Sequence, residues 1–188
     1  PSNIIMHPAL KDRFDFIRKV RKESTRPQTR VLQYTPYSFG ENRQPKKKYL
    51  LVPSTSSENR LYIPMGFVEP YIICSNLALT ISDCSLYHFG VLTSSLHMAW
   101  MKFVCGRLKS DYRYSASLVY NLFPWPDAIT DEQKNLIGAT AQCILDVREQ
   151  LGESYEKMYS TNMNPKLLKA HFDNDAAVLK AFGFYASW

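Results

Sequence analysis

The stretch LYHFGVLTSSLHMAWMKFVC, residues 86–105, decides the fold, because it is long, apolar and bounded by polar segments. It predicts one buried helix that ends at Gly106, a residue type that favours the left-handed conformation following a helix C-terminus. The large side chains Met98, Trp100, Met101 and Phe103 are therefore expected in the core, and not around a cofactor.

The segment that precedes this stretch is rich in short β-forming runs. Alternating and β-branched residues between turn formers predict strands here. They are expected over residues 31–34, 49–53, 61–64, 71–74 and 77–81, with a turn over residues 54–59.

The segment that follows residue 128 is mostly helical. Thr130 and Gln133 form a capping box that predicts a helix to about Leu151, and Asn164-Pro165 predicts the start of another. We therefore expect an α+β fold. Residues 1–128 form a β-rich domain with the long buried helix, and residues 129–188 form a helical C-terminal extension.

Charge is unevenly distributed, and this asymmetry indicates a polyanionic partner. Residues 1–60 hold 13 Lys and Arg against 5 Asp and Glu, a net charge of +8, whereas residues 61–188 have a net charge of −2. A basic surface binds phosphates by releasing condensed counterions, although it can also be only a solvated face. The basic candidates for phosphate contacts lie in a predicted amphipathic helix over residues 8–24 and in a lysine run. They are Arg18, Arg21, Lys22, Lys46, Lys47 and Lys48.

Cysteine spacing, hydropathy and the N-terminal residues indicate the cellular environment. The four cysteines include no CxxC pair, which argues against a zinc site and for a reducing, cytoplasmic environment. No apolar run approaches the roughly 18 residues of a membrane span, and the N-terminus has no signal-peptide pattern. Because the sequence begins at Pro1 without methionine, we expect it to be a piece of a longer protein.

We find no catalytic constellation and no metal-binding pattern. Asn164-Pro165 is followed by Lys166, so it is not the Asn-Pro-Pro-aromatic loop of adenine methyltransferases. Glycine-rich phosphate loops are missing, and the four histidines are scattered, each best interpreted as hydrogen-bonded in the interior or exposed. The chain by itself is therefore expected not to be catalytic.

A charged and aromatic segment follows the long apolar stretch. If residues 107–126 are extended, Lys109, Asp111 and Arg113 lie on one face, while Tyr112 and Tyr114 anchor the other face on the core. The charged face suits a DNA groove. A surface ion cluster of little energetic value is the alternative.

The same region carries a resemblance to a known family. Three groups of residues carry it: His97-Met98-Ala99-Trp100-Met101 with Cys105-Gly106-Arg107-Leu108, then Tyr112-Arg113-Tyr114-Ser115, then Val119-Tyr120-Asn121 with Phe123-Pro124-Trp125-Pro126. Two further segments agree, namely Ser56-Ser57-Glu58-Asn59-Arg60 and, more weakly, Leu168-Lys169-Ala170-His171. In this order they resemble the target-recognition region of bacterial MmeI-like restriction–modification enzymes.

The resemblance implies a function in a larger enzyme. It implies sequence-specific binding of double-stranded DNA by this chain, next to an upstream adenine methyltransferase domain of the same polypeptide. That domain uses S-adenosylmethionine, and a parent that also cleaves DNA needs magnesium. The resemblance further implies base reading near Ser54, at Asn76 and Leu77, and along Lys109, Asp111 and Arg113.

The hydrogen-bonding groups of the bases indicate which base each of these residues can bind. Lysine donates to guanine N7 and O6 and aspartate accepts from cytosine N4, so Lys109 and Asp111 are predicted to read one G·C pair. Asn76 suits adenine, although a turn asparagine is the alternative. Leu77 offers only apolar contact, for example with a thymine methyl group.

Two other functions stay open at this point. One is a stand-alone DNA-binding specificity subunit or regulator without an enzyme in the same polypeptide. The other is an RNA-binding module that stacks bases on tyrosines.

Overall fold

A computed structural model describes residues 7–41 and 43–184 of the protein. It divides into two compact units, Pro1–Arg43 and Gln44–Trp188. Helices account for 49% and strands for 11% of the structure, with small antiparallel sheets and a helical C-terminal region. This confirms the predicted α+β class.

The first unit is helical. Helix α2 (Pro8–Lys22) is followed by α3 (Pro27–Val31) and the 3-10 turn η1 (Leu32–Tyr34), so the helix predicted over residues 8–24 is confirmed. The strand predicted over residues 31–34 is wrong. Pro27 presets the first turn of α3, and helical backbone then continues through Val31 because no neighbouring strand pairs with this segment among the described residues.

The second unit contains an antiparallel sheet with β1 (Tyr49–Pro53) at its centre. Strand β3 (Gly66–Val68) pairs on one side and β4 (Ala78–Ile81) on the other. The strands predicted over residues 49–53 and 77–81 are confirmed. Tyr49, Leu50 and Val52 are buried because the sheet packs against the central helices.

Two other predicted strands are wrong. Residues 61–64 are irregular, with Leu61 exposed and residues 62–64 buried, because Pro64 has no N–H for a strand ladder and Met65 N–H donates to the Ile63 carbonyl over 2.9 Å. Residues 71–74 are also irregular. The backbone of this segment bonds side chains and not another strand. For example, Tyr49 Oη donates to the Ile72 carbonyl over 2.8 Å.

The long apolar stretch forms two helices, not the single helix expected. They are α4 (Leu86–Leu92) and α5 (Ser95–Val104). The break lies at Ser94, whose hydroxyl donates to the Val91 carbonyl over 2.7 Å and accepts from His97 N–H over 3.2 Å. Serine caps a helix start well, so the polar pair Thr93-Ser94 ends one helix and starts the next inside the core. Gly106 is not a helix cap, since Cys105 holds that position and Gly106 begins a strand.

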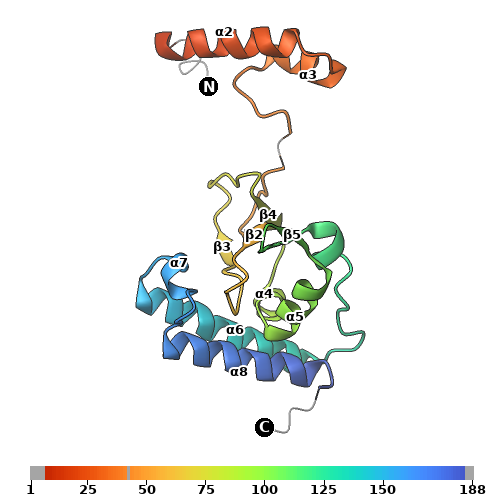
Figure 1. Ribbon diagram of the computed structural model, residues 1–188, viewed down its shortest axis with the longest axis vertical. Coiled ribbons are helices and arrows are strands. Elements are labelled where there is room, and N and C mark those ends of the chain that lie inside the picture. Colours follow the sequence, from red (N-terminus) through yellow and green to blue (C-terminus); the bar gives the residue numbers. More distant parts are fainter. Residues whose placement is uncertain (1–6, 42, 185–188) are drawn as a thin grey trace. The chain divides into compact units, whose positions relative to one another are not determined.

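Three further helices complete the second unit: α6 (Asp131–Leu151), α7 (Tyr155–Met158) and α8 (Pro165–Ala181). The capping box of Thr130 and Gln133 and the helix start at Asn164 are confirmed. In Figure 1, α6 and α8 lie side by side, and α6 also packs against α4.

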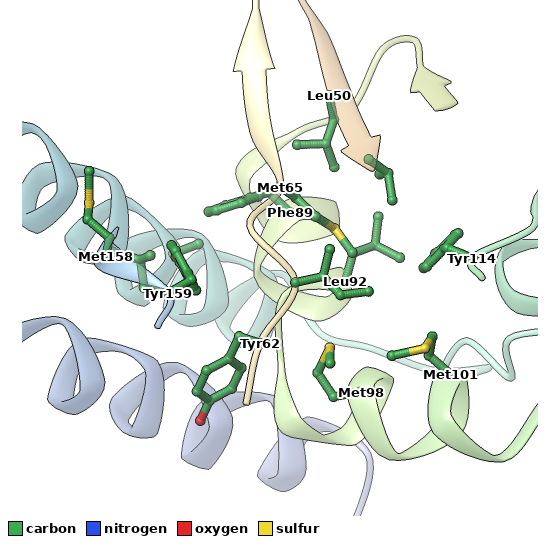
Figure 2. Packing of buried hydrophobic residues seen from close by; sticks show 14 of the residues in the cluster. Leu50, Tyr62, Met65, Phe89, Leu92, Met98, Met101, Tyr114, Met158 and Tyr159 are labelled. Carbon is green, nitrogen blue, oxygen red and sulfur yellow. The ribbon is translucent and has the colours of Figure 1, made fainter. Parts of the chain in front are cut away.

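The core of the second unit joins the sheet to all of these helices. Figure 2 shows Met65, Phe89 and Leu92 at its centre, with Tyr159 on one side and Tyr114 on the other. Each of these five side chains is buried. The predicted core positions Met98 and Met101 are confirmed, whereas Phe103 is 88% exposed and Trp100 is half-buried.

A buried polar network crosses this core. Arg148 Nε donates to Tyr159 Oη over 2.6 Å, and Arg148 Nη1 donates to the Met65 carbonyl over 2.7 Å. Tyr159 Oη lies 2.9 Å from His171 Nε2, and the His171 ring stacks on Tyr62 with 4.1 Å between centroids. The arginine thus ties helix α6 to the irregular segment before β3. Its position on the apolar side of α6 was not predicted.

Candidate nucleic-acid interface

A small second sheet carries the charged residues singled out from the sequence. Its strands, in spatial order, are β2 (Thr55–Ser56), β6 (Asp111–Arg113) and β5 (Gly106–Leu108), all antiparallel. Leu108 pairs with Asp111, so the hairpin between β5 and β6 turns over two residues, Lys109 and Ser110.

The expectation that residues 107–126 are extended is therefore wrong. The backbone reverses at Lys109, whose φ is +58°, and later coils into a π-helical turn, η2 (Ala116–Tyr120). Lys109 lies at the tip of the hairpin, and only Asp111 and Arg113 share a strand face. A single extended strand would leave its backbone N–H and carbonyl groups unpaired here. In the hairpin, β5 and β6 pair these groups with each other.

The opposite face of β6 is buried, as predicted. Tyr112 and Tyr114 are both buried, and Tyr114 Oη lies 2.9 Å from Nε2 of His97 on α5. Burial lowers the pKa of His97 to about 3 and raises the pKa of Tyr114. These two groups are thus both neutral at neutral pH, and they fix the strand on its supporting helix.

Ser54 joins the two sheets. Pro53 pairs with Ala78 in the first sheet, and Thr55 pairs with Arg113 in the second. Between them, Ser54 N–H donates to the Leu77 carbonyl over 3.1 Å, and Tyr114 N–H donates to the Ser54 carbonyl over 2.9 Å. Backbone hydrogen bonds therefore join Ser54 to the turn that holds Asn76 and Leu77 and to the end of the strand that holds Asp111 and Arg113. We refer to the six residues predicted to read bases as the reading edge: Ser54, Asn76, Leu77, Lys109, Asp111 and Arg113.

The turn of Asn76 and Leu77 presents both side chains to solvent. Ala78 N–H donates to the Ser75 carbonyl over 3.1 Å, which closes the turn. Leu77 N–H donates to Ser75 Oγ over 3.3 Å, and the Leu77 side chain is 75% exposed. An exposed leucine in a well-bonded turn suits an apolar contact with a partner. Asn76, also exposed, is a turn residue whose side-chain Oδ1 accepts from Ser75 Oγ over 3.4 Å.

The loop before this turn is held by two residues that sequence reasoning missed. Gln44 Nε2 donates to the carbonyls of Pro70 and Ile72 over 3.0 and 2.8 Å, and Cys74 N–H donates to Gln44 Oε1 over 3.3 Å. Tyr49 adds its hydrogen bond to Ile72. No local signal predicts these contacts, because Gln44 lies 26 to 30 residues from its partners.

The charged residues of the hairpin do not neutralise one another. Among the described residues, no ion pair joins Lys109, Asp111 and Arg113. The surface ion cluster considered as the alternative is therefore not formed. Lys109 and Arg113 are exposed and Asp111 is half-buried, so the charged groups stay open to a partner.

The phosphate candidates differ in availability. Arg21 Nη1 donates to the carbonyls of Leu32 and Thr35 over 2.9 and 2.8 Å, so this guanidinium supports the first unit. Its spacing from Ile17 explains this, because four residues place it on the packed face of α2. Arg18 pairs with Asp15 at the surface.

The remaining phosphate candidates are exposed lysines. Lys22 and Lys46 are exposed, and so are Lys47 and Lys48, which lie 3.7 and 3.5 Å from single carboxylates. Exposed pairs of this kind contribute at most about 1 kcal/mol, so a phosphate can displace them.

Metal sites and membrane spans are two other features that the structure addresses. Within residues 7–41 and 43–184, no three His, Cys, Asp or Glu side chains are grouped so as to hold a metal ion. In the same part of the protein, no helix is both long and apolar enough to cross a membrane.

Comparison with known proteins identifies the family. A family model described as the MmeI target recognition domain matches residues 1–127. The chain belongs to this family. DNA methyltransferase A of Bacillus subtilis (strain 168) is 41% identical over 177 residues, which cover 94% of this chain and 20% of that protein. The solved structure of the type IIL restriction–modification enzyme MmeI in complex with DNA matches with a TM-score of 0.90 and 41% identity. That match covers 98% of the present sequence and 25% of the MmeI polypeptide.

The chain thus spans between a fifth and a quarter of the length of the two relatives. The division into residues 1–128 and 129–188 stays a prediction about which part reads DNA. In the structure, α6 from the second part packs directly on α4 from the first.

Proposed function

We propose that this chain reads the double-stranded DNA target of a longer, S-adenosylmethionine-dependent adenine methyltransferase, and that it does so with the reading edge. The observation that carries the proposal is the convergence at Ser54. Its N–H donates to the Leu77 carbonyl and its carbonyl accepts from Tyr114 N–H, so the turn at Leu77 and the β5–β6 hairpin both adjoin Ser54. A groove several base pairs long needs such a set of separate contacts.

The hairpin offers the sharpest base chemistry. Lys109 at the tip can donate to guanine N7 and O6, and Asp111, two residues on, can accept from cytosine N4. Both partners belong to one G·C pair, so the two side chains specify its orientation. Arg113, exposed on the same strand face as Asp111, extends the contact along the groove.

The loops contribute differently. Ser54 Oγ donates to the Leu77 carbonyl, so its hydroxyl offers only acceptor capacity to a base. Asn76 presents an amide that matches the N6 and N7 edge of adenine, and Leu77 presents an apolar surface to a thymine methyl group. Arg18, Lys22 and the lysines at positions 46–48 hold phosphates, which position the domain without specifying sequence.

The rest of the parent supplies the chemistry in this proposal. The names of the two relatives, a DNA methyltransferase and a restriction–modification enzyme in complex with DNA, support this assignment. S-adenosylmethionine binds to the upstream methyltransferase domain, and magnesium is needed where the parent also cleaves.

A sign-swap experiment tests the proposal. The full-length parent is expressed in a host that lacks adenine methylation, and modified adenines are mapped genome-wide. The wild type should modify one motif that contains a G·C pair. The double variant Lys109→Glu, Asp111→Arg should modify the motif with that pair inverted, because each good base contact provides about 1–3 kcal/mol of discrimination.

Each contrary result has a distinct meaning. An unchanged motif in the double variant refutes the role of Lys109 and Asp111. A parent that binds duplex DNA but methylates nothing is instead a stand-alone DNA-binding module. RNA that displaces duplex DNA of the same sequence supports the RNA-binding alternative.

A further inference from the structure

Arg107, on strand β5 next to the hairpin turn, contacts three other residues. It pairs with Tyr112 across the hairpin, and its guanidinium carbon lies 4.1 Å from the centroid of the Tyr112 ring. Its Nη1 donates to the Ser110 carbonyl over 2.8 Å. The same nitrogen lies 3.8 Å from Glu58 Oε2, in the turn that follows β2.

These contacts restrain the two-residue turn formed by Lys109 and Ser110. Tyr112 is buried, so its ring provides a fixed surface on which the planar guanidinium stacks. From that position Nη1 orients the Ser110 carbonyl, the last peptide group of the turn. The ion pair with Glu58 connects the hairpin to the turn that follows β2.

The turn needs such support, because its first residue has an unfavourable backbone conformation. The φ of Lys109 is +58°, a region that glycine adopts freely and that other residues adopt only when their surroundings impose it. In two-residue hairpins this position commonly holds glycine or asparagine. Here it holds the lysine that would meet the base pair.

We propose that Arg107 is a positioning residue for DNA reading: it holds the Lys109-Ser110 turn so that Lys109 and Asp111 face one base pair together. This inference rests on the proposed function. In this proposal Arg107 acts through the turn, since its Nη1 bonds the Ser110 carbonyl and its guanidinium lies over the Tyr112 ring. Its loss should therefore reduce discrimination at the base pair that Lys109 and Asp111 read, and leave the other positions of the motif unchanged.

The alternative role for Arg107 is a phosphate contact. The variant Arg107→Lys distinguishes this role from positioning of the turn. A lysine keeps the positive charge and can bind a phosphate, but it has no planar fork to stack on Tyr112 while bonding the Ser110 carbonyl. Arg107→Lys should thus behave like Arg107→Ala if the residue positions the turn. It should behave like the wild type if the residue only supplies charge.

Lys102→Ala is the matched control. Lys102 Nζ lies 5.9 Å from the same Tyr112 ring, and this variant removes the same unit of charge without touching the turn. All variants are made in the full-length parent. Methylation rates are measured on duplexes that carry each of the four base pairs at each position of the motif, and thermal unfolding is recorded alongside.

We expect both Arg107 variants to lose about tenfold in discrimination at the single G·C pair, within the range that one good base contact provides. The Lys102 variant should keep the wild-type ratio. The midpoint of thermal unfolding should fall by only a few degrees, about 1 kcal/mol, since the Arg107 side chain is 44% exposed and its contacts are confined to the hairpin and the adjoining turn.

Two results would overturn the inference while leaving the proposed function intact. One is a wild-type ratio in Arg107→Lys. The other is an equal loss on all sequences, which indicates a phosphate contact. A wild-type parent with no sequence preference would instead refute the proposed function, and this inference with it.

Discussion

Acidification should destabilise the second unit through two buried histidines. His97 and His171 are both fully buried. Burial lowers the pKa of each to about 3, and the neighbouring Arg148 guanidinium acts in the same direction on His171. In the unfolded state a histidine has its usual pKa of about 6.5. The unfolded state therefore takes up protons that the folded state excludes.

The sign and size of the effect follow from this difference. Because both folded pKa values are lowered, their stabilising contribution is present above about pH 6.5 and is lost as the pH falls toward 3. Between about pH 7 and pH 5, each histidine should reduce the free energy of unfolding by about 2 kcal/mol, or about 4 kcal/mol together. Burial raises the pKa of Asp175, which acts in the opposite direction, and lowers the pKa of His88, which acts in the same direction, so about 4 kcal/mol is the contribution of His97 and His171 alone.

The assay is urea unfolding of the 188-residue protein at a series of pH values, followed by tryptophan fluorescence. Trp100 and Trp125 are half-buried in the second unit, so the change in fluorescence reports on that unit. His97→Gln is the control, because glutamine can still bond Tyr114 and cannot be protonated. It should remove about half of the loss between pH 7 and pH 5.

An unfolding free energy that is equal at pH 7 and pH 5 would refute the reasoning. So would histidine NMR titrations in which all four imidazoles have midpoints near the usual value. The effect also bears on the reading edge, since His97 bonds Tyr114 and Tyr114 N–H bonds Ser54. Because folded His97 stays neutral until the pH approaches 3, DNA binding should weaken together with global unfolding as the pH falls.

The remaining predictions concern backbone positions. Gly90→Ala should cost about 1–3 kcal/mol of unfolding free energy, because the new Cβ would lie 2.6 Å from Ile137 Cγ2 and 2.9 Å from Asn174 Oδ1. Gly138→Ala, on the neighbouring helix, should instead stabilise by up to about 1 kcal/mol, since the nearest atom is 3.7 Å away and alanine favours helix. Urea unfolding measures both, and equal effects would contradict the described packing of α4 on α6. Lys109→Gly should change the unfolding free energy by less than about 1 kcal/mol, because glycine accepts a φ of +58°. It should still abolish discrimination at the G·C pair in the methylation assay; retained discrimination would show that the lysine side chain does not read the base.

The sequence by itself determined the features that depend on near neighbours. The helix starts at Thr130 and Asn164 were predictable, because a cap involves only residues within one turn. The burial of Tyr112 and Tyr114 followed from alternation along a short strand. The family resemblance also came from the sequence alone, since the order of motifs carries it.

Tertiary structure decided what depends on distant partners. The segment at residues 31–34 is helical because strands need a neighbour to pair with, and the described part of its unit offers none. The buried position of Arg148 depends on a carbonyl 83 residues away, which no local pattern shows. The reading edge exists for the same reason. Leu77 and Tyr114 reach Ser54 only because two small sheets meet there, and backbone hydrogen bonds across such distances form only in the folded protein.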